Sequence, residues 1–245
     1  MYSAFKKTDI PTYVDMHYII LSFLLEKIYS KPFDKLLLEK ISIPLNLASI
    51  TFFPDKSLCA ANEILIDNNV CIGEVHNKKA RKAKELGFCV GHAGLFCNGN
   101  DLLKFLLSFF NYTLLNKETI KLMLEHNDIE KYNLKILEDL TNKKGDINSL
   151  YCEVIKKSKD LYIPLNYNCM GARYKNKTIA LNDVVMPSDN SICFSGFTGP
   201  MYQIDFEKKI IVVVMCNLLY YTKVNKKERK DKTVEIITDI VKQIC

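Results

Sequence analysis

Arginine is scarce in this sequence. Its only arginines are Arg81, Arg173 and Arg229. The 34 lysines and arginines together outnumber the 28 aspartates and glutamates, which gives a formal net charge of +6. Proteins that read nucleic acids rely on arginine forks and on basic stripes. Here the lysines are dispersed among asparagines and isoleucines, and even the lysine-rich stretch 78–84 alternates with alanines, as a solvated helix face does. We therefore expect no nucleic-acid partner and interpret the charge as a solubilised surface.

Long apolar runs and a regular cysteine pattern are absent as well. The apolar run 18–25 is too short to cross a bilayer, and no secretory signal opens the chain. The nine cysteines form an odd set without regular spacing, and Cys216 stands in an apolar stretch where cysteine behaves as a small buried hydrophobe. We expect free thiols, no disulfide framework, no membrane span and a reducing, cytoplasmic location. Internal repeats are also lacking.

The periodicity that is present changes along the chain. Apolar spacing predicts helices over 16–29 (apolar nearly all round, and so expected to be buried on most sides), 32–41, a segment that follows an Asn98 N-cap, 117–126 and 228–244. Short strands are expected around a turn at 175–177, and a hairpin within 195–217 turns at 207–209. This order predicts an α+β fold. A mostly helical part, 1–165, is followed by antiparallel strands and a C-terminal helix, 166–245, of the same domain.

The segment GFCVGHAGLFCNGN, residues 87–100, places a histidine between two cysteines among several glycines. Cys89, His92 and Cys97 are spaced almost like three zinc ligands, but a structural zinc site needs four convergent ligands, and the sequence offers no fourth at suitable spacing. Glycines permit tight or left-handed backbone, and Asn98 suits a helix N-cap. The pattern favours a turn that leads into a helix, with a structural His92 and with no metal or cofactor.

Three stretches resemble the serine β-lactamase and penicillin-binding-protein family, especially its class C-like members, which include esterases and D-amino-acid peptidases. Residues 73–109, GEVHNKKARK…GFCVGHAGLFCNGNDLLKFLLSF, are similar to the family's G-x-V-H-D, G-H-A-G-L-F and D-L-x-x-F patterns. Residues 12–47 resemble its Y-S-D-x-N segment with two following helices, and residues 194–217 its H-T-G-F-T-G strand, next strand and L-T-N ending. The resemblance implies a partial β-lactamase/transpeptidase-like fold.

The resemblance also implies site residues. Members of this family activate a serine nucleophile with the lysine of S-x-x-K, and a tyrosine of Y-S-D shares the acid–base work. A K-T-G or H-T-G strand, the third motif, supplies a cation, a hydroxyl and one oxyanion N–H donor. Tyr13 matches the tyrosine and Asp15 the third residue of its motif. Ser195 and Gly196 match the end of the third motif, which makes the N–H of Phe197 the expected oxyanion donor.

Two positions depart from the family pattern. Phe194 stands where lysine or histidine is usual, and an aromatic ring supplies no positive charge and no hydrogen-bond donor. In the family the nucleophile precedes the tyrosine by many tens of residues, whereas twelve residues precede Tyr13. Ser3 and Lys6 do spell S-x-x-K, but the six residues that follow leave no room for the strands and helix that normally separate the motifs. We expect the nucleophile half to be missing.

Purely structural interpretations of these residues stay open at this point. Tyr13 also fits an ordinary buried tyrosine at a helix entrance, and Ser195 fits an ordinary strand residue. For His76, in the G-x-V-H segment, a loop hydrogen bond is the favoured role.

The leading hypothesis is a β-lactamase-related serine hydrolase that transfers acyl groups from a β-lactam, an ester or a D-amino peptide and is inactive alone. Exposed apolar strand edges and helix faces would then require a partner chain with the S-x-x-K half, or a homo-oligomer. One alternative is half of a split hydrolase. Another is a non-catalytic module that binds a small molecule or peptide in the old cleft.

Overall fold

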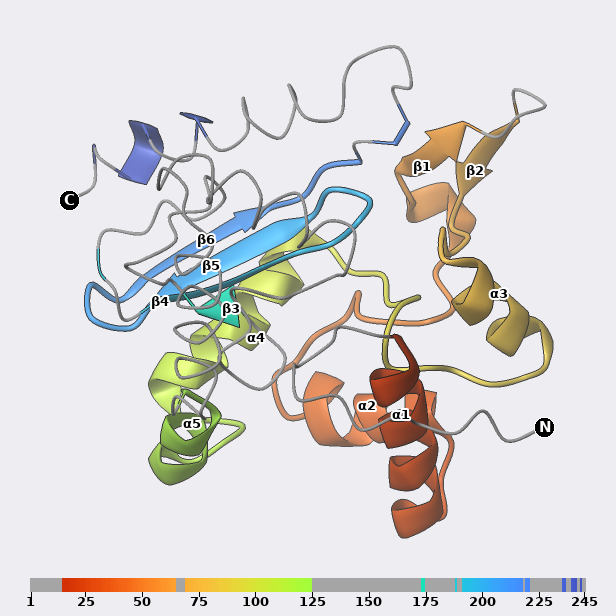
Figure 1. Ribbon diagram of the computed structural model, residues 1–245, viewed down its shortest axis with the longest axis horizontal. Coiled ribbons are helices and arrows are strands. Elements are labelled where there is room, and N and C mark those ends of the chain that lie inside the picture. Colours follow the sequence, from red (N-terminus) through yellow and green to blue (C-terminus); the bar gives the residue numbers. More distant parts are fainter. Residues whose placement is uncertain are drawn as a thin grey trace, which may run out of the picture.

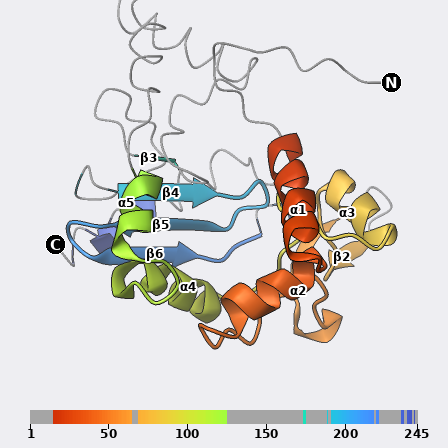
Figure 2. The same cartoon turned by 90° about the horizontal axis from the view of Figure 1, so that it is seen from below.

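The computed structural model describes residues 15–64, 69–124, 173–174, 188, 191–217, 219–220, 235–236, 239–241 and 243 of the chain. An antiparallel sheet carries α4 and α5 on one face, while the other helices and a small two-stranded sheet lie to one side of it (Figures 1 and 2). The α+β class predicted from the sequence is confirmed. The elements, in order, are α1 (Asp15–Tyr29), α2 (Phe33–Leu37), the π-helical η1 (Leu38–Ser42), the 3-10 helix η2 (Lys56–Leu58), β1 (Ala61–Ile64), β2 (Val70–Ile72), α3 (Lys78–Glu85), α4 (Gly99–Asn111), α5 (Lys117–Leu124), β3 (Arg173–Tyr174), β4 (Ser191–Ser195), β5 (Met201–Asp205) and β6 (Ile210–Val214).

The larger sheet has the strand order β3-β4-β5-β6, with every pair antiparallel. The predicted hairpin is confirmed as β5 and β6, whose register pairs Asp205 with Ile210. The fully buried carboxylate of Asp205 stabilises the turn by accepting hydrogen bonds from the backbone N–H groups of Glu207 (3.0 Å) and Lys208 (2.8 Å). It also accepts from the N–H (2.8 Å) and hydroxyl (2.6 Å) of Ser188, so one side chain fixes the turn and a neighbouring segment.

Helix α4 supplies the main core contact with this sheet. Leu106, which is 1% exposed, packs against Ile192 of β4 and Ile204 of β5. The helix begins as predicted, because Asn98 accepts a hydrogen bond from the N–H of Asp101 (2.8 Å). The Asp101 carboxylate also binds the N–H (2.6 Å) and hydroxyl (2.7 Å) of Ser49, which ties the start of α4 to the segment after η1.

Helix α1 has the predicted position but not the predicted burial. Ser22 is its one buried residue, whereas most of its large apolar side chains are exposed. The sequence prediction of burial on most sides is therefore wrong for the described residues, because the elements they form leave most of the helix surface uncovered. The exposed residues are Met16, Tyr18, Ile20, Leu21, Phe23, Leu24, Leu25, Ile28 and Tyr29.

The strands β1 and β2 were not predicted from the sequence. They pair antiparallel from Ala61 with Ile72 to Ile64 with Val70, and together with α3 they form what we call the small lobe, residues 61–64 and 69–85. The side-chain amide of Asn217, which follows β6, donates to the carbonyl of Ala61 (2.8 Å) and joins this lobe to the larger sheet.

Several predictions fall outside the described residues. They are the strands around 175–177, most of the helix predicted over 228–244, the position of Tyr13 and the division of the domain after residue 165; each stays a prediction. Within the described part of the chain, none of the helices combines the length and the apolar character that crossing a membrane requires.

Candidate functional site

The third-motif turn, residues 196–199, connects β4 with β5. The N–H of Gly196 donates to the carbonyl of Pro200 (2.8 Å), and the N–H of Gly199 donates to the carbonyl of Gly196 (3.1 Å). Gly199 has a φ of 128°, a backbone conformation that strongly favours glycine. The Cys216 thiol donates to the Gly199 carbonyl (3.2 Å), so the segment after β6 also supports this turn. The result is a short turn held by three hydrogen bonds, with Phe197 at the surface.

The strand that leads into this turn carries the two other third-motif positions. Ser195 is the last residue of β4 and pairs with Met201. Phe194 stacks on Tyr202 of β5, with ring centroids 6.5 Å apart. The position where the family usually has lysine or histidine therefore makes an aromatic contact on the sheet, and a cation for substrate binding would have to come from elsewhere.

The small lobe brings a histidine against the third-motif turn. The ring of His76 lies nearly parallel to that of Phe197, at a centroid distance of 5.3 Å and an interplanar angle of 16°. Its Nδ1 lies 2.7 Å from the Oε2 of Glu63 in β1, as expected for the predicted loop hydrogen bond. The other Glu63 oxygen lies 3.4 Å from the Arg81 guanidinium, which also donates to the carbonyl of Val75 (2.8 Å).

The next residue, Asn77, joins the start of α3 to the G-H-A-G-L-F loop. Its Oδ1 accepts hydrogen bonds from the N–H groups of Lys79 (2.9 Å) and Ala80 (3.2 Å), which makes it the N-cap of α3. The same oxygen lies 3.2 Å from His92 Nε2. Burial keeps the pKa of His92 below its ordinary 6.5, against the opposing effect of Asp15, so the ring is neutral at neutral pH. These contacts match the structural role expected for His92.

Asp15 occupies the first turn of α1 and faces the same region. Its carboxylate lies 2.9 Å from Lys79 Nζ and 4.0 Å from His92 Nε2. Burial alone would raise the pKa of Asp15, but the Lys79 hydrogen bond, the His92 ring when it is protonated at acid pH, and the charge of Lys79 outweigh it and lower the pKa. Asp15 is thus an ionised carboxylate that connects α1 to α3.

The two cysteines near His92 are protonated thiols. Burial raises the pKa of the Cys89 thiol to about 11 and also raises that of Cys97. Among the described residues, no group of three or more histidines, cysteines or carboxylates is placed to hold a metal ion.

Gly91 allows α1 to approach this loop. A Cβ atom at Gly91 would lie 3.0 Å from the carbonyl oxygen of Tyr18, a backbone atom that cannot move without α1. Gly91→Ala should therefore lower the free energy of unfolding by about 1–3 kcal/mol. The control is Gly99→Ala, whose Cβ meets the flexible Met215 side chain and should change stability by less than about 0.5 kcal/mol. Equal denaturant midpoints for both variants would contradict the close approach.

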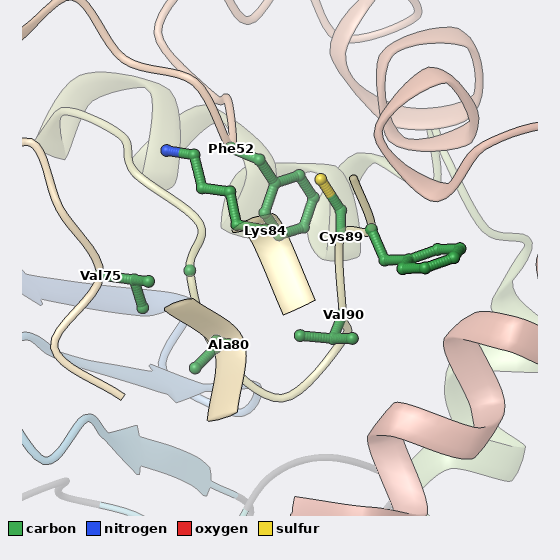
Figure 3. Close-up of a pocket in the computed structure, with 9 residues that line it drawn as sticks. Phe52, Val75, Ala80, Lys84, Cys89 and Val90 are labelled. Carbon is green, nitrogen blue, oxygen red and sulfur yellow. The ribbon is translucent and has the colours of Figure 1, made fainter. Parts of the chain in front are cut away.

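The two hollows of this region differ in size. Figure 3 shows a gap lined by Phe52, Val75, Ala80 and Cys89, but its volume is about 10 Å³, enough for roughly one water molecule. It is a packing gap and not a substrate site. A wider groove of about 460 Å³ runs between α1 and α3, with Ile19 and Phe23 on one side and lysines of α3 on the other.

The structure brings together three motifs through a short segment of the small lobe. His76 contacts the third-motif turn, Asn77 contacts the G-H-A-G-L-F loop, and Lys79 contacts Asp15, the third residue of the Y-S-D motif. Sequence reasoning missed this arrangement, because a histidine and an asparagine before a basic helix resemble any solvated helix start. The tyrosine of the Y-S-D motif, Tyr13, lies outside the described residues.

A helical region beside an antiparallel sheet with this third-motif turn is the architecture of the penicillin-binding-protein and serine β-lactamase class. The family model described as Beta-lactamase matches residues 9–234. The chain belongs to the β-lactamase family.

Individual relatives agree with this family. A protein of Escherichia coli K12 named as a D-alanyl-D-alanine carboxypeptidase is 29% identical over 133 residues, which cover 45% of this chain and 30% of that protein. A simvastatin synthase mutant from Aspergillus terreus shares the fold at a TM-score of 0.56 and 16% identity, over 92% of this chain and 55% of the other. An octameric penicillin-binding-protein homologue from Pyrococcus abyssi shares the fold at a TM-score of 0.51 and 16% identity, over 84% of this chain and 38% of the other. The chain thus spans about a third to a half of these relatives.

Proposed function

We propose that this chain forms part of a β-lactamase-related serine hydrolase that transfers acyl groups from a β-lactam, an ester or a D-amino peptide. The chain supplies the Tyr13 and Asp15 motif and the Ser195-Gly196-Phe197 motif. The S-x-x-K nucleophile comes from a segment outside these 245 residues, on the same polypeptide or on a partner chain, and without it the chain is catalytically incomplete. The observation that carries this proposal is the family match over residues 9–234.

In this proposal the serine attacks the acyl carbonyl, and Tyr13 takes part in moving its proton. The N–H of Phe197 donates to the oxyanion that forms, and the Ser195 hydroxyl helps to hold the substrate. The backbone hydrogen bonds that close the third-motif turn support the oxyanion role, because a preorganised donor needs a fixed backbone. Asp15 acts indirectly, by tying α1 to α3 through Lys79.

The exposed apolar surface of α1 supports the proposal that a further segment packs against this helix. Its uncovered side chains continue into the groove between α1 and α3, so one segment could bury both. The apolar strand β6 also ends the sheet order with no further partner strand among the described residues. The S-x-x-K segment is our proposed occupant. The six cysteines that the structure describes are free thiols, which supports a reducing compartment such as the cytoplasm.

The test begins with the coding sequence upstream of Met1 and in the adjacent reading frames. The longer polypeptide, or the chain mixed with a neighbouring product that carries S-x-x-K, is assayed with a chromogenic ester and a chromogenic β-lactam. Hydrolysis that the 245-residue chain lacks by itself supports the proposal. If the completed protein binds these ligands saturably without turnover, the chain is a binding module, an outcome that Phe194 in the third motif would explain.

Without its cover the chain should self-associate through α1. We expect the purified chain to sediment above its monomer mass of 28.2 kDa, because exposed apolar surface of this extent favours association. Replacing Ile20 and Leu24, one helical turn apart and each 47% exposed, by lysine should shift it toward the monomer. Leu122→Lys, on α5 and 54% exposed, should not. A wild-type monomer in sedimentation velocity would contradict this prediction.

A further inference from the structure

We infer that His76, held by Glu63, is a positioning residue that fixes the Gly196–Phe197 peptide of the third-motif turn. The inference rests on the proposed function in one respect, namely that the Phe197 N–H serves as the oxyanion donor. The observation behind it is the nearly parallel stack of the His76 and Phe197 rings, at 5.3 Å and 16°.

The stack matters because of the backbone it joins. Phe197 is 66% exposed, so its ring extends from the sheet and His76 covers one of its faces. The preceding residue is glycine, whose backbone has more conformational freedom than that of any other residue. A contact that holds the Phe197 side chain therefore restricts the peptide whose N–H would face the oxyanion.

The His76 ring is itself held in place. Its Nδ1 lies 2.7 Å from Glu63 Oε2, and a carboxylate that accepts from Nδ1–H fixes both the tautomer and the plane of an imidazole. The Glu63 side chain is only 14% exposed and lies 3.4 Å from Arg81. Arg81 in turn donates to the carbonyl of Val75, the residue directly before His76. Glu63 and Arg81 thus form a support behind the ring.

The lobe that carries this support is attached to the sheet at a second point. Asn217, after β6, donates to the Ala61 carbonyl at the start of β1 (2.8 Å). Cys216, its neighbour, donates to the Gly199 carbonyl of the turn (3.2 Å). The third-motif turn is therefore held by the small lobe on one side and by the segment after β6 on the other.

Hydrogen–deuterium exchange of the peptide that spans 195–201 tests the inference without any catalytic activity. His76→Ala should speed exchange of the Gly196 and Gly199 amides about 2- to 12-fold, the factor that corresponds to loss of an aromatic pair. His76→Phe keeps an aromatic ring for the stack but loses the hydrogen bond to Glu63, so it should restore part of the protection. Glu63→Gln, which weakens the support but leaves the ring, should give an intermediate rate. Phe53→Ala is the control, because this exposed ring contacts Lys84 and not the turn.

Unchanged exchange in His76→Ala would overturn the inference, as would equal acceleration in the Phe53→Ala control. Exchange of the β5 core around Ile204 separates local loosening from general unfolding, since it should stay at the wild-type rate. In the completed hydrolase His76→Ala should lower kcat with little change in KM, because the oxyanion forms only in the transition state. If that hydrolase shows no turnover, the proposed function fails while the exchange result still stands.

Discussion

Asp205→Ala should lower the free energy of unfolding by about 3–5 kcal/mol. The carboxylate is fully buried and accepts four hydrogen bonds, two from Ser188 and one each from the backbone N–H groups of Glu207 and Lys208. Alanine would leave the buried Ser188 N–H and hydroxyl without their acceptor, at a cost of about 1–3 kcal/mol for each group. It would also release the turn between β5 and β6. The decrease in the free energy of unfolding is measured by denaturant unfolding, followed with a spectroscopic probe in the core of the sheet.

Glu207→Ala is the matched control, because this neighbouring carboxylate is exposed in the same turn. Its effect should stay within about 0.5 kcal/mol. Loss of the same size in both variants would show that the turn tolerates no substitution and would remove the special role of Asp205.

The contribution of Asp205 should depend on pH in one direction. Burial alone raises the pKa of Asp205, but the hydrogen bonds from Lys208, Ser188 and Glu207 outweigh it, and the pKa lies below its ordinary 3.8. A carboxyl whose folded-state pKa is depressed stabilises the protein above its unfolded-state pKa and loses that effect as pH falls through the folded-state value. The stability difference between wild type and Asp205→Asn should therefore be constant near neutral pH and shrink below about pH 4.

Tyr13→Phe should lower kcat of the completed hydrolase on the order of 10²–10⁴-fold, the usual contribution of a positioned acid–base group. The change removes one hydroxyl and leaves the ring, so protein folding should not be affected. The assay is turnover of the chromogenic ester or β-lactam that the completed enzyme hydrolyses.

Tyr29→Phe is the control for the loss of a tyrosine hydroxyl, because Tyr29 is an exposed residue at the far end of α1. It should change kcat by less than about twofold. A Tyr13→Phe enzyme within tenfold of wild type would remove Tyr13 from the acid–base machinery and would favour an ordinary tyrosine at a helix entrance.

The local elements were the predictable part of the fold. The positions of α1, α4 and α5 follow from apolar spacing. Asn98 fixes the start of α4 because its side chain accepts a hydrogen bond from the N–H of Asp101, three residues later. The hairpin β5–β6 joins a mixed strand to a strand made wholly of β-branched residues, across a turn with three charged residues. These signals are local, because the residues that produce the pattern also make the contacts that define the helix start and the turn.

The small lobe and the exposure of α1 were not predictable in this way. β1 and β2 are short strands without alternating apolar residues, so only their pairing defines them. The burial of α1 depends on what packs against it, and a helix that is apolar all round gives no information on which face is covered. The stack of His76 on Phe197 likewise joins residues that are remote in sequence, and neither type of residue marks the contact.

The attachment of the small lobe to the sheet has a consequence for folding. The Asn217–Ala61 hydrogen bond closes a loop of 156 residues, and the His76–Phe197 stack joins elements nearly as remote. Such contacts form only after the chain has lost the entropy of closing a long loop, whereas the β5–β6 hairpin needs only a short turn. We expect the β5–β6 hairpin to form early and the lobe to dock late. The third-motif turn would then reach its final geometry in a late step, and refolding followed at Phe197 would lag behind refolding followed at the β5–β6 hairpin.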